Sequence, residues 1–166
     1  MTALATTPRP TSAKDESRAL SERKVAPIVA AVDGSPASRA AIGEAVRLAV
    51  ELSAPIVFVY VRPGPGGMFG APVYQRRLTR EMARARRVLD TALAVAGSAG
   101  VPAEGEILEG SPRRRISEFA RDRSARLIVV GSRPRKLGQS VSTGVIRSAG
   151  RPVIVARSIP QLTAAA

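Results

Sequence analysis

Short runs of apolar residues, each closed by a turn signal, alternate along this chain with longer segments of helical periodicity. The first run, VAPIVAAV, ends at Asp-Gly-Ser-Pro and predicts a strand that is buried on both faces. Five strands are predicted in this way, over residues 25–32, 55–61, 101–110, 127–130 and 151–156. Strands that alternate with helices favour a parallel sheet with helices on both faces.

The segments between the strands have the start signals and apolar faces of helices. Four helices are predicted, over residues 36–52, 74–96, 112–124 and 140–149. Ser35 and Ser111 stand at the cap positions of two of them, and each is followed by a proline that suits a first turn. Residues 62–72 are rich in Gly and Pro and predict an irregular loop.

The third strand is the weakest, because its apolar residues only alternate with polar ones, and we expect it at a sheet edge. Right-handed crossovers then favour the strand order 3-2-1-4-5. The predicted fold class is α/β, a single-domain, three-layer α/β/α structure with a five-stranded parallel sheet of the Rossmann-like type. Such sheets bind ligands where the strand order reverses, here between strands 1 and 4. The stretches VDGSP and GSRPRKLGQSVS lie at this switch point.

The amino-acid content excludes several kinds of chemistry. With 166 residues the chain is long enough for one domain, and it contains no cysteine and no histidine. This excludes disulfides, the usual zinc sites, and Ser-His or Cys-His catalysis. No apolar run reaches membrane-spanning length, and residues 1–24 lack the apolar core of a signal peptide. We therefore expect a cytoplasmic protein with a disordered tail over 1–24, a domain over 25–157 and a frayed tail over 158–166.

The chain is strongly basic, with 26 Lys and Arg against 13 Asp and Glu and a net charge of +13. Such an excess attracts polyanions non-specifically. Aromatic residues make up only 3% of the chain, so a base-stacking surface is hard to build and no specific nucleic-acid partner is expected. The segment SPRRR, residues 111–115, starts a helix with three arginines that oppose its dipole. This suits either a solvated helix start or a bound anion.

Three segments resemble a known family. VAAVDGSPASRAAIGEA is similar to the first strand and helix of universal stress proteins, whose strand ends in Val-Asp-Gly-Ser. LIVVGSR is similar to the family's fourth strand, and SRPRKLGQSVSTGVIRSAGRPVIVA to its closing segment. The resemblance extends over about residues 25–157. It implies an adenine nucleotide alpha hydrolase-like fold, a non-enzymatic role in stress responses, and a homodimer that forms through the edge of the last strand, Pro152–Ala156.

Family members that bind ATP resemble one another in a glycine motif: Gly-x-x-Gly, nine residues, then Gly followed by Ser or Thr. On this chain the first glycine of the motif is Gly131 and the hydroxyl residue is Ser140, while Pro134 and Gln139 occupy the other two glycine positions. Only four residues separate Pro134 from Gln139. The motif is thus shortened, and Pro134 lacks the backbone N–H that a phosphate-binding loop uses.

The resemblance implies cofactor-binding residues but no catalytic or metal-binding ones. The set is Asp33, Gly131, Arg133, Gly138, Ser140, Val141 and Ser142. Asp33 is expected near the adenosine, and Ser140 with Ser142 opens a helix whose N-terminus favours phosphate. Structural explanations stay open beside these roles. Asp33 is a good turn residue, Ser140 a good helix cap, and Arg133 part of a loop that is equally well solvated.

Two functions are compatible with these residues. The chain either senses ATP or another adenine nucleotide at the switch point, or it is a nucleotide-free dimeric interaction module of the same fold whose ATP motif has degenerated. An enzyme is not expected, because Asp33 is the only well-placed carboxylate and no His or Cys is present.

Overall fold

The structure is a computed structural model that describes residues 25–64, 71–132 and 140–157. Strands and helices alternate through this part of the chain. In order they are β1 (Ile28–Ala31), α2 (Pro36–Leu52), β2 (Ile56–Arg62), α3 (Ala71–Ser98), β3 (Ala103–Glu109), α4 (Pro112–Asp122), β4 (Leu127–Gly131), α5 (Val141–Ser148) and β5 (Val153–Ala156). The two predicted tails, residues 1–24 and 158–166, lie outside the described residues.

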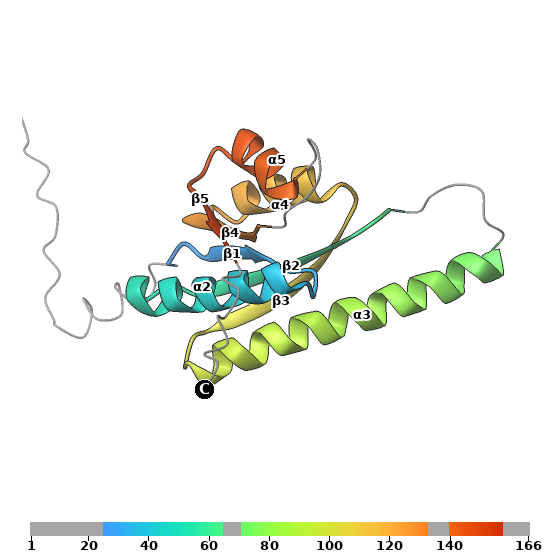
Figure 1. The fold of residues 1–166 in the computed structure, drawn as a ribbon, viewed down its shortest axis with the longest axis horizontal. Helices are drawn as coiled ribbons and strands as arrows, with labels where there is room; N and C mark the ends of the chain where they lie inside the picture. The colour runs from blue at the N-terminus through green and yellow to red at the C-terminus, as the bar shows by residue number, and fades with distance from the viewer. Residues whose placement is uncertain (1–24, 65–70, 133–139, 158–166) are drawn as a thin grey trace, which may run out of the picture.

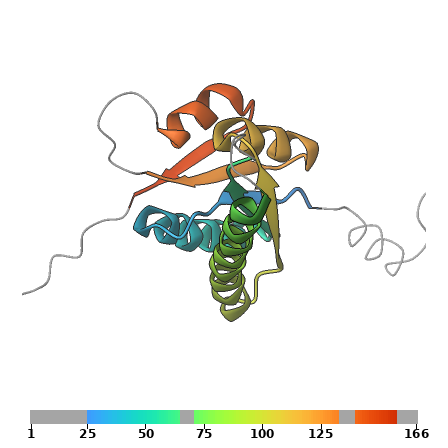
Figure 2. The same cartoon turned by 90° about the vertical axis from the view of Figure 1, so that its right-hand side faces the viewer.

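The strands form one parallel sheet with the order β3-β2-β1-β4-β5. Helices α2 and α3 pack on one face of the sheet, and α4 and α5 pack on the other (Figures 1 and 2). This confirms the predicted three-layer α/β/α fold and its strand order. The weak third strand is at one edge, and β5 is at the other.

The central strands are apolar throughout because each one contributes to two cores. In β1, Ile28 and Ala30 belong to the core under α2 and α3, whereas Val29 belongs to the core under α4 and α5. All three residues are 0% exposed. In β2, Phe58 and Val57 divide between the same two cores. Successive side chains of a strand point to opposite faces, so a strand covered on both sides has no polar position.

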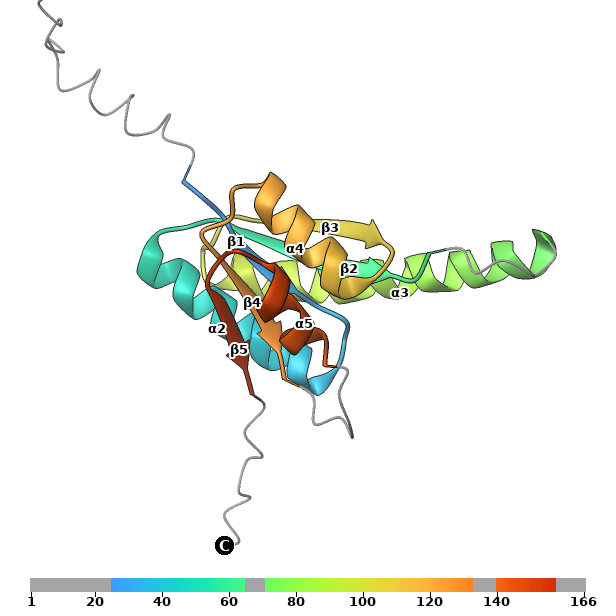
Figure 3. The same ribbon diagram turned by 90° about the horizontal axis from the view of Figure 1, so that it is seen from above.

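Helix α2 lies close to the sheet because most of the side chains on its buried face are small. This face includes Ala37, Ala41, Ala45 and Ala49. Helix α3 is different, because it has 28 residues and its N-terminal half extends beyond the sheet (Figure 3). Among residues 75–98 of α3, whose burial is described, the buried core residues begin at Ala85 and include Leu89.

Three of the element boundaries that differ from the prediction involve a proline. Helix α3 begins at Ala71 rather than at residue 74, because the predicted loop residue Pro72 fits a first helical turn. Strand β1 begins only after Pro27, and β5 only after Pro152. A proline has no N–H for the strand ladder, yet both prolines accept a hydrogen bond from a neighbouring segment through their carbonyl oxygens.

The two predicted serine caps behave differently. The Ser35 hydroxyl accepts a hydrogen bond of 3.1 Å from the backbone N–H of Ser38, as a helix cap does. Ser111 stands at the cap position of α4, but its side chain makes no capping hydrogen bond. Sequence pattern alone predicted both caps in the same way, and only the Ser35 cap is confirmed.

This difference gives a paired prediction for stability. Replacing Ser35 with Ala removes a formed cap, so we expect the free energy of unfolding to fall by about 1 kcal/mol. Replacing Ser111 with Ala removes no capping bond, and we expect a change within about 0.5 kcal/mol. Urea denaturation followed by circular dichroism measures both. Equal losses in the two variants would contradict the assignment of the caps.

Candidate functional site

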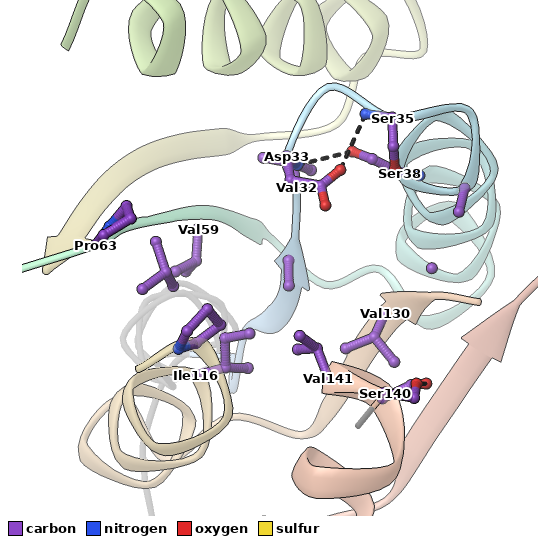
Figure 4. Close-up of a pocket in the computed structure, with 16 residues that line it drawn as sticks. Val32, Asp33, Ser35, Ser38, Val59, Pro63, Ile116, Val130, Ser140 and Val141 are labelled. Atoms are coloured by element: carbon purple, nitrogen blue, oxygen red, sulfur yellow. Dashed lines mark hydrogen bonds between the residues drawn. The ribbon is translucent and has the colours of Figure 1, made fainter. Parts of the chain in front are cut away.

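A cavity of approximately 410 Å³ opens at the carboxyl ends of β1, β2 and β4 (Figure 4). This volume lies in the range of small-molecule binding sites. We call it the switch-point pocket, because it lies where the strand order reverses. Its lining residues are Ala31, Val32, Asp33, Ser35, Ala37, Ser38, Val59, Val61, Pro63, Pro112, Ile116, Val130, Gly131, Ser140, Val141 and Ser142.

The pocket has an apolar wall and a polar rim. The wall comes from β2, the end of β4 and the first two turns of α4, with Val59, Val130 and Ile116 among its side chains (Figure 4). The rim carries one carboxylate, Asp33, and the serine hydroxyls at the starts of α2 and α5. No lysine or arginine is among the described residues that line the pocket. The arrangement suits a flat apolar group held by a few hydrogen bonds.

A tight turn between β1 and α2 fixes Asp33. Its carboxylate oxygen Oδ1 accepts a hydrogen bond of 2.9 Å from the Ser35 N–H, and its own N–H donates to Ser38 Oγ at 3.1 Å. Gly34 has a φ of +79°, which favours glycine, and a Cβ there would lie 2.9 Å from Val88 Cγ2. Asp33, Gly34 and Ser35 are thus each explained by the geometry of this turn. Asp33 also lies at the rim of the pocket.

Gly131 brings α2 and β4 together. A Cβ at this position would lie 2.3 Å from the carbonyl oxygen of Ala37 and 2.5 Å from its carbonyl carbon. These distances are far below van der Waals contact, so the first turn of α2 packs against β4 only because residue 131 has no side chain. The first glycine of the predicted motif is thus a packing glycine, and it also lines the pocket.

The start of α5 forms the other side of the rim. Ser140 stands at the cap position of this helix, but its side chain makes no capping hydrogen bond. Its hydroxyl instead hydrogen-bonds to the hydroxyl of Ser142, which is 7% exposed. Ser140 therefore occupies the predicted cap position, but its side chain does not make the capping bond. Both hydroxyls lie at the pocket, beside a helix N-terminus that favours negative charge.

Five of the seven predicted site residues meet in this one cavity. They are Asp33, Gly131, Ser140, Val141 and Ser142. Arg133 and Gly138 lie outside the described residues. The sequence interpretation missed the wall from β2 and α4, including Val61, Pro63 and Ile116. The β2 part of this wall could have been predicted from the strand order, because the end of β2 must lie beside the end of β1 in a parallel sheet.

The sequence model of the universal stress protein family matches residues 24–157. The chain belongs to the universal stress protein family. A universal stress protein of Methanocaldococcus jannaschii is 33% identical over 138 residues, which cover 78% of this chain and 81% of the relative.

Two solved structures agree with this family assignment. A universal stress protein from Archaeoglobus fulgidus has a TM-score of 0.69 and 27% identity, covering 83% of this chain and 98% of that one. A structure of the universal stress protein from Archaeoglobus fulgidus in complex with dAMP has a TM-score of 0.64 and 28% identity, covering 80% and 98%.

No helix in residues 25–64, 71–132 or 140–157 is both long and apolar enough to cross a membrane. Within the same ranges, no group of three or more Asp or Glu side chains gathers as potential metal ligands.

The packing role of Gly131 is testable without any ligand. Replacing it with Ala forces a methyl group against the Ala37 carbonyl, so we expect a loss of about 2–3 kcal/mol in the free energy of unfolding. Gly43 in α2 is a matched control, because a Cβ there meets nothing within 4 Å. Gly43→Ala should stabilise the protein by about 0.5–1 kcal/mol through helix propensity. Chemical denaturation measures both, and a Gly131→Ala variant as stable as the wild type would contradict the packing role.

Proposed function

We propose that the switch-point pocket binds an adenine nucleotide and that the chain acts as a non-enzymatic nucleotide sensor of the universal stress protein family. The supporting observation is that five residues expected around the nucleotide line one cavity at the carboxyl ends of β1 and β4. The dAMP complex of the related Archaeoglobus fulgidus protein supports the ligand class.

The apolar wall is suited to the base. Val59, Ile116 and Val130 offer the aliphatic surface on which a purine ring packs. Asp33 at the rim supplies a carboxylate, which accepts hydrogen bonds from the hydroxyl or amino groups of a nucleoside. The Asx-type turn holds Asp33 in place before any ligand arrives, so little ordering entropy is lost on binding.

We expect the phosphate group of the nucleotide to bind at the N-terminus of α5. Ser140 and Ser142 lie there, and the helix has no acidic residue in its first turn. Among the described residues the pocket offers phosphate a helix dipole and hydroxyls but no cationic side chain. A helix N-terminus stabilises an anion by about 0.3–1 kcal/mol, up to about 2 kcal/mol when partly buried. AMP should therefore bind at most about thirtyfold more tightly than adenosine.

Binding without turnover follows from the chemistry of the same lining. A hydrolytic site needs a nucleophile, a proton acceptor and a proton donor in reach of each other. The described lining holds a single carboxylate, and the whole chain has no histidine and no cysteine. These residues can bind a nucleotide by shape and hydrogen bonds but cannot hydrolyse it. Whether the pocket is occupied would then be the property that a sensor reports.

Adenosine is the sharpest probe of this proposal. It carries no phosphate, so its binding cannot arise from the net charge of +13. We expect calorimetry on the full chain to detect adenosine, AMP and ATP. Asp33→Asn keeps an oxygen for the turn to Ser35 but removes the carboxylate, and it should weaken all three ligands by about tenfold.

Asp90→Asn provides the control for this experiment, because it removes one negative charge from an exposed position on α3. Its affinity for adenosine should equal that of the wild type. Absence of adenosine binding to the wild-type chain, or equal loss in the two variants, would contradict the proposal.

A second function, a dimeric interaction module without nucleotide, is also supported by specific observations. Gly131 is explained by its contact with Ala37, and one Asp33 oxygen by its bond to Ser35. The hydroxyls of Ser140 and Ser142 bind each other. These residues thus have roles that need no ligand.

The two edges of the sheet differ in a way that favours a dimer through β5. On β3, Glu104 and Glu106 are held by Arg123 at 2.7 and 3.0 Å, and Glu109 pairs with Arg62. Charged side chains of this kind protect an edge from pairing. Strand β5 has the sequence VIVA and carries no charge. We propose that β5 pairs with its counterpart in a second copy.

The register of β5 decides which residue tests this dimer. Pro152 and Ala156 accept hydrogen bonds from Ile128 and Ser132 on the β4 side. Because strand hydrogen bonds alternate in direction, Ile154 also bonds toward β4, whereas Val155 presents its N–H outward.

Val155→Pro should therefore give a folded monomer in light scattering. Ile154→Pro breaks a bond within the sheet and should cost about 3 kcal/mol or more of stability. An unchanged dimer mass for Val155→Pro would place the interface elsewhere.

A further inference from the structure

A second cavity of approximately 410 Å³ lies between α4 and α5, which run side by side over the sheet (Figure 3). We call it the α4–α5 groove. Its lining consists of four arginines, one glutamate, five hydroxyl residues and one glycine, and the charged ones are Arg113, Arg114, Arg121, Arg147 and Glu118. Only Ser140 is shared with the switch-point pocket.

The groove carries an unbalanced positive charge. Its one carboxylate, Glu118, already pairs with Arg115 at 2.9 Å and with Arg114 at 3.8 Å. Among the described residues, no ion pair joins a carboxylate to the other three arginines of the lining, Arg113, Arg121 and Arg147. These three arginines line one groove without a carboxylate partner of their own, so a bound anion gains charge-assisted contacts there without having to break an ion pair.

Gly144 holds Arg113 in this position. A Cβ on Gly144 would lie 2.2 Å from Cδ and 2.6 Å from Cγ of Arg113, so the arginine stem crosses α5 where α5 has no side chain. Glycine inside a short helix lowers helix propensity. The crossing gives that glycine a structural reason, and it makes Arg113 a packed part of the groove rather than a freely moving surface chain.

A hydroxyl contact fixes the two walls relative to each other. Ser117 of α4 is 2% exposed, and its Oγ lies 2.7 Å from Oγ of Ser148 on α5. One of the two hydroxyls donates to the other, and the hydroxyl that accepts can donate its own proton to a backbone carbonyl of its own helix. The spacing of the arginines on α4 from Arg147 on α5 is therefore set by the fold.

We propose that the α4–α5 groove binds condensed phosphate, meaning a chain of two or more linked phosphate groups. Several arginines along one polar groove match several charges along one flexible anion, and guanidinium forks suit phosphate oxygens. A base-stacking ligand does not fit, because no aromatic or apolar side chain is in the lining. Two sources share this chemistry, free polyphosphate and the phosphate tail of a nucleotide.

Tripolyphosphate is the probe, used in calorimetric titrations of the full chain. The groove variant is Arg113→Gln with Arg147→Gln. The control is Arg76→Gln with Arg80→Gln, which removes the same charge from exposed positions on α3. We expect the groove variant to bind tripolyphosphate about tenfold more weakly or worse, and the control to change by less than about twofold.

Titration with ATP distinguishes the two sources of condensed phosphate, free polyphosphate and the phosphate tail of a nucleotide. A nucleotide tail in the groove predicts that ATP displaces tripolyphosphate and that the groove variant weakens ATP but not adenosine. Free polyphosphate predicts that ATP affinity is unchanged, and either result supports the phosphate site. No binding to the wild type, or equal losses in both double variants, overturns it. Adenosine reports only on the switch-point pocket, so the two proposals fail separately.

A third variant tests the geometry at constant charge. Gly144→Ala keeps every arginine and improves helix propensity, but its methyl group displaces Arg113 from the groove. Its tripolyphosphate affinity should fall, whereas Gly43→Ala, placed where a Cβ meets nothing, should bind like the wild type. Wild-type affinity in Gly144→Ala would overturn a site built on Arg113. Circular dichroism confirms folding, and the arginine variant keeps the test decisive if Gly144→Ala does not fold.

Discussion

The contact between the first turn of α2 and the end of β4 determines the rest of the site. Residue 131 must lack a side chain, because the Ala37 carbonyl occupies the place of its Cβ. With α2 held this close, the Val-Asp-Gly-Ser turn lies beside the exit of β4, and Asp33 faces the start of α5 across one cavity. The alanine face of α2 serves the same end, since larger side chains would lift the helix from the sheet.

Much of the fold was predictable, because the residues that specify it act locally or through simple periodicity. The buried runs around Val29 and Ile128 are apolar at every position, which only a strand between two helical layers requires. The alternation in β3 identified an edge. The boundaries of the elements were less predictable. Pro72 fits the first turn of a helix as well as it fits a loop. Strand β1 begins only after Pro27, because proline has no N–H to donate to the strand ladder.

The site was predictable in its position but not in the roles of its residues. The switch point brought Asp33, Gly131 and Ser140 into one cavity as expected. Their individual contacts depend on tertiary distances that no local pattern contains. Ser35 and Ser111 precede helices in the same way, yet only one hydroxyl meets its N–H. Gly131 reads as a ligand glycine in the motif, and the approach of Ala37 explains it by packing.

The distribution of charge connects the sheet edge, the pocket and the groove. Carboxylates of the described chain are concentrated where they pair with arginines, above all on β3, whose edge they close. That placement leaves the α4–α5 groove with more arginine than acid. Ser140 belongs to the groove and to the switch-point pocket, and it begins the helix whose N-terminus faces the pocket. A ligand on either side therefore acts on the same turn of α5. The fold thus places the proposed nucleoside pocket, which holds a single carboxylate, and the cationic groove on the two sides of one helix start, so that the two proposed sites share the turn that Ser140 begins.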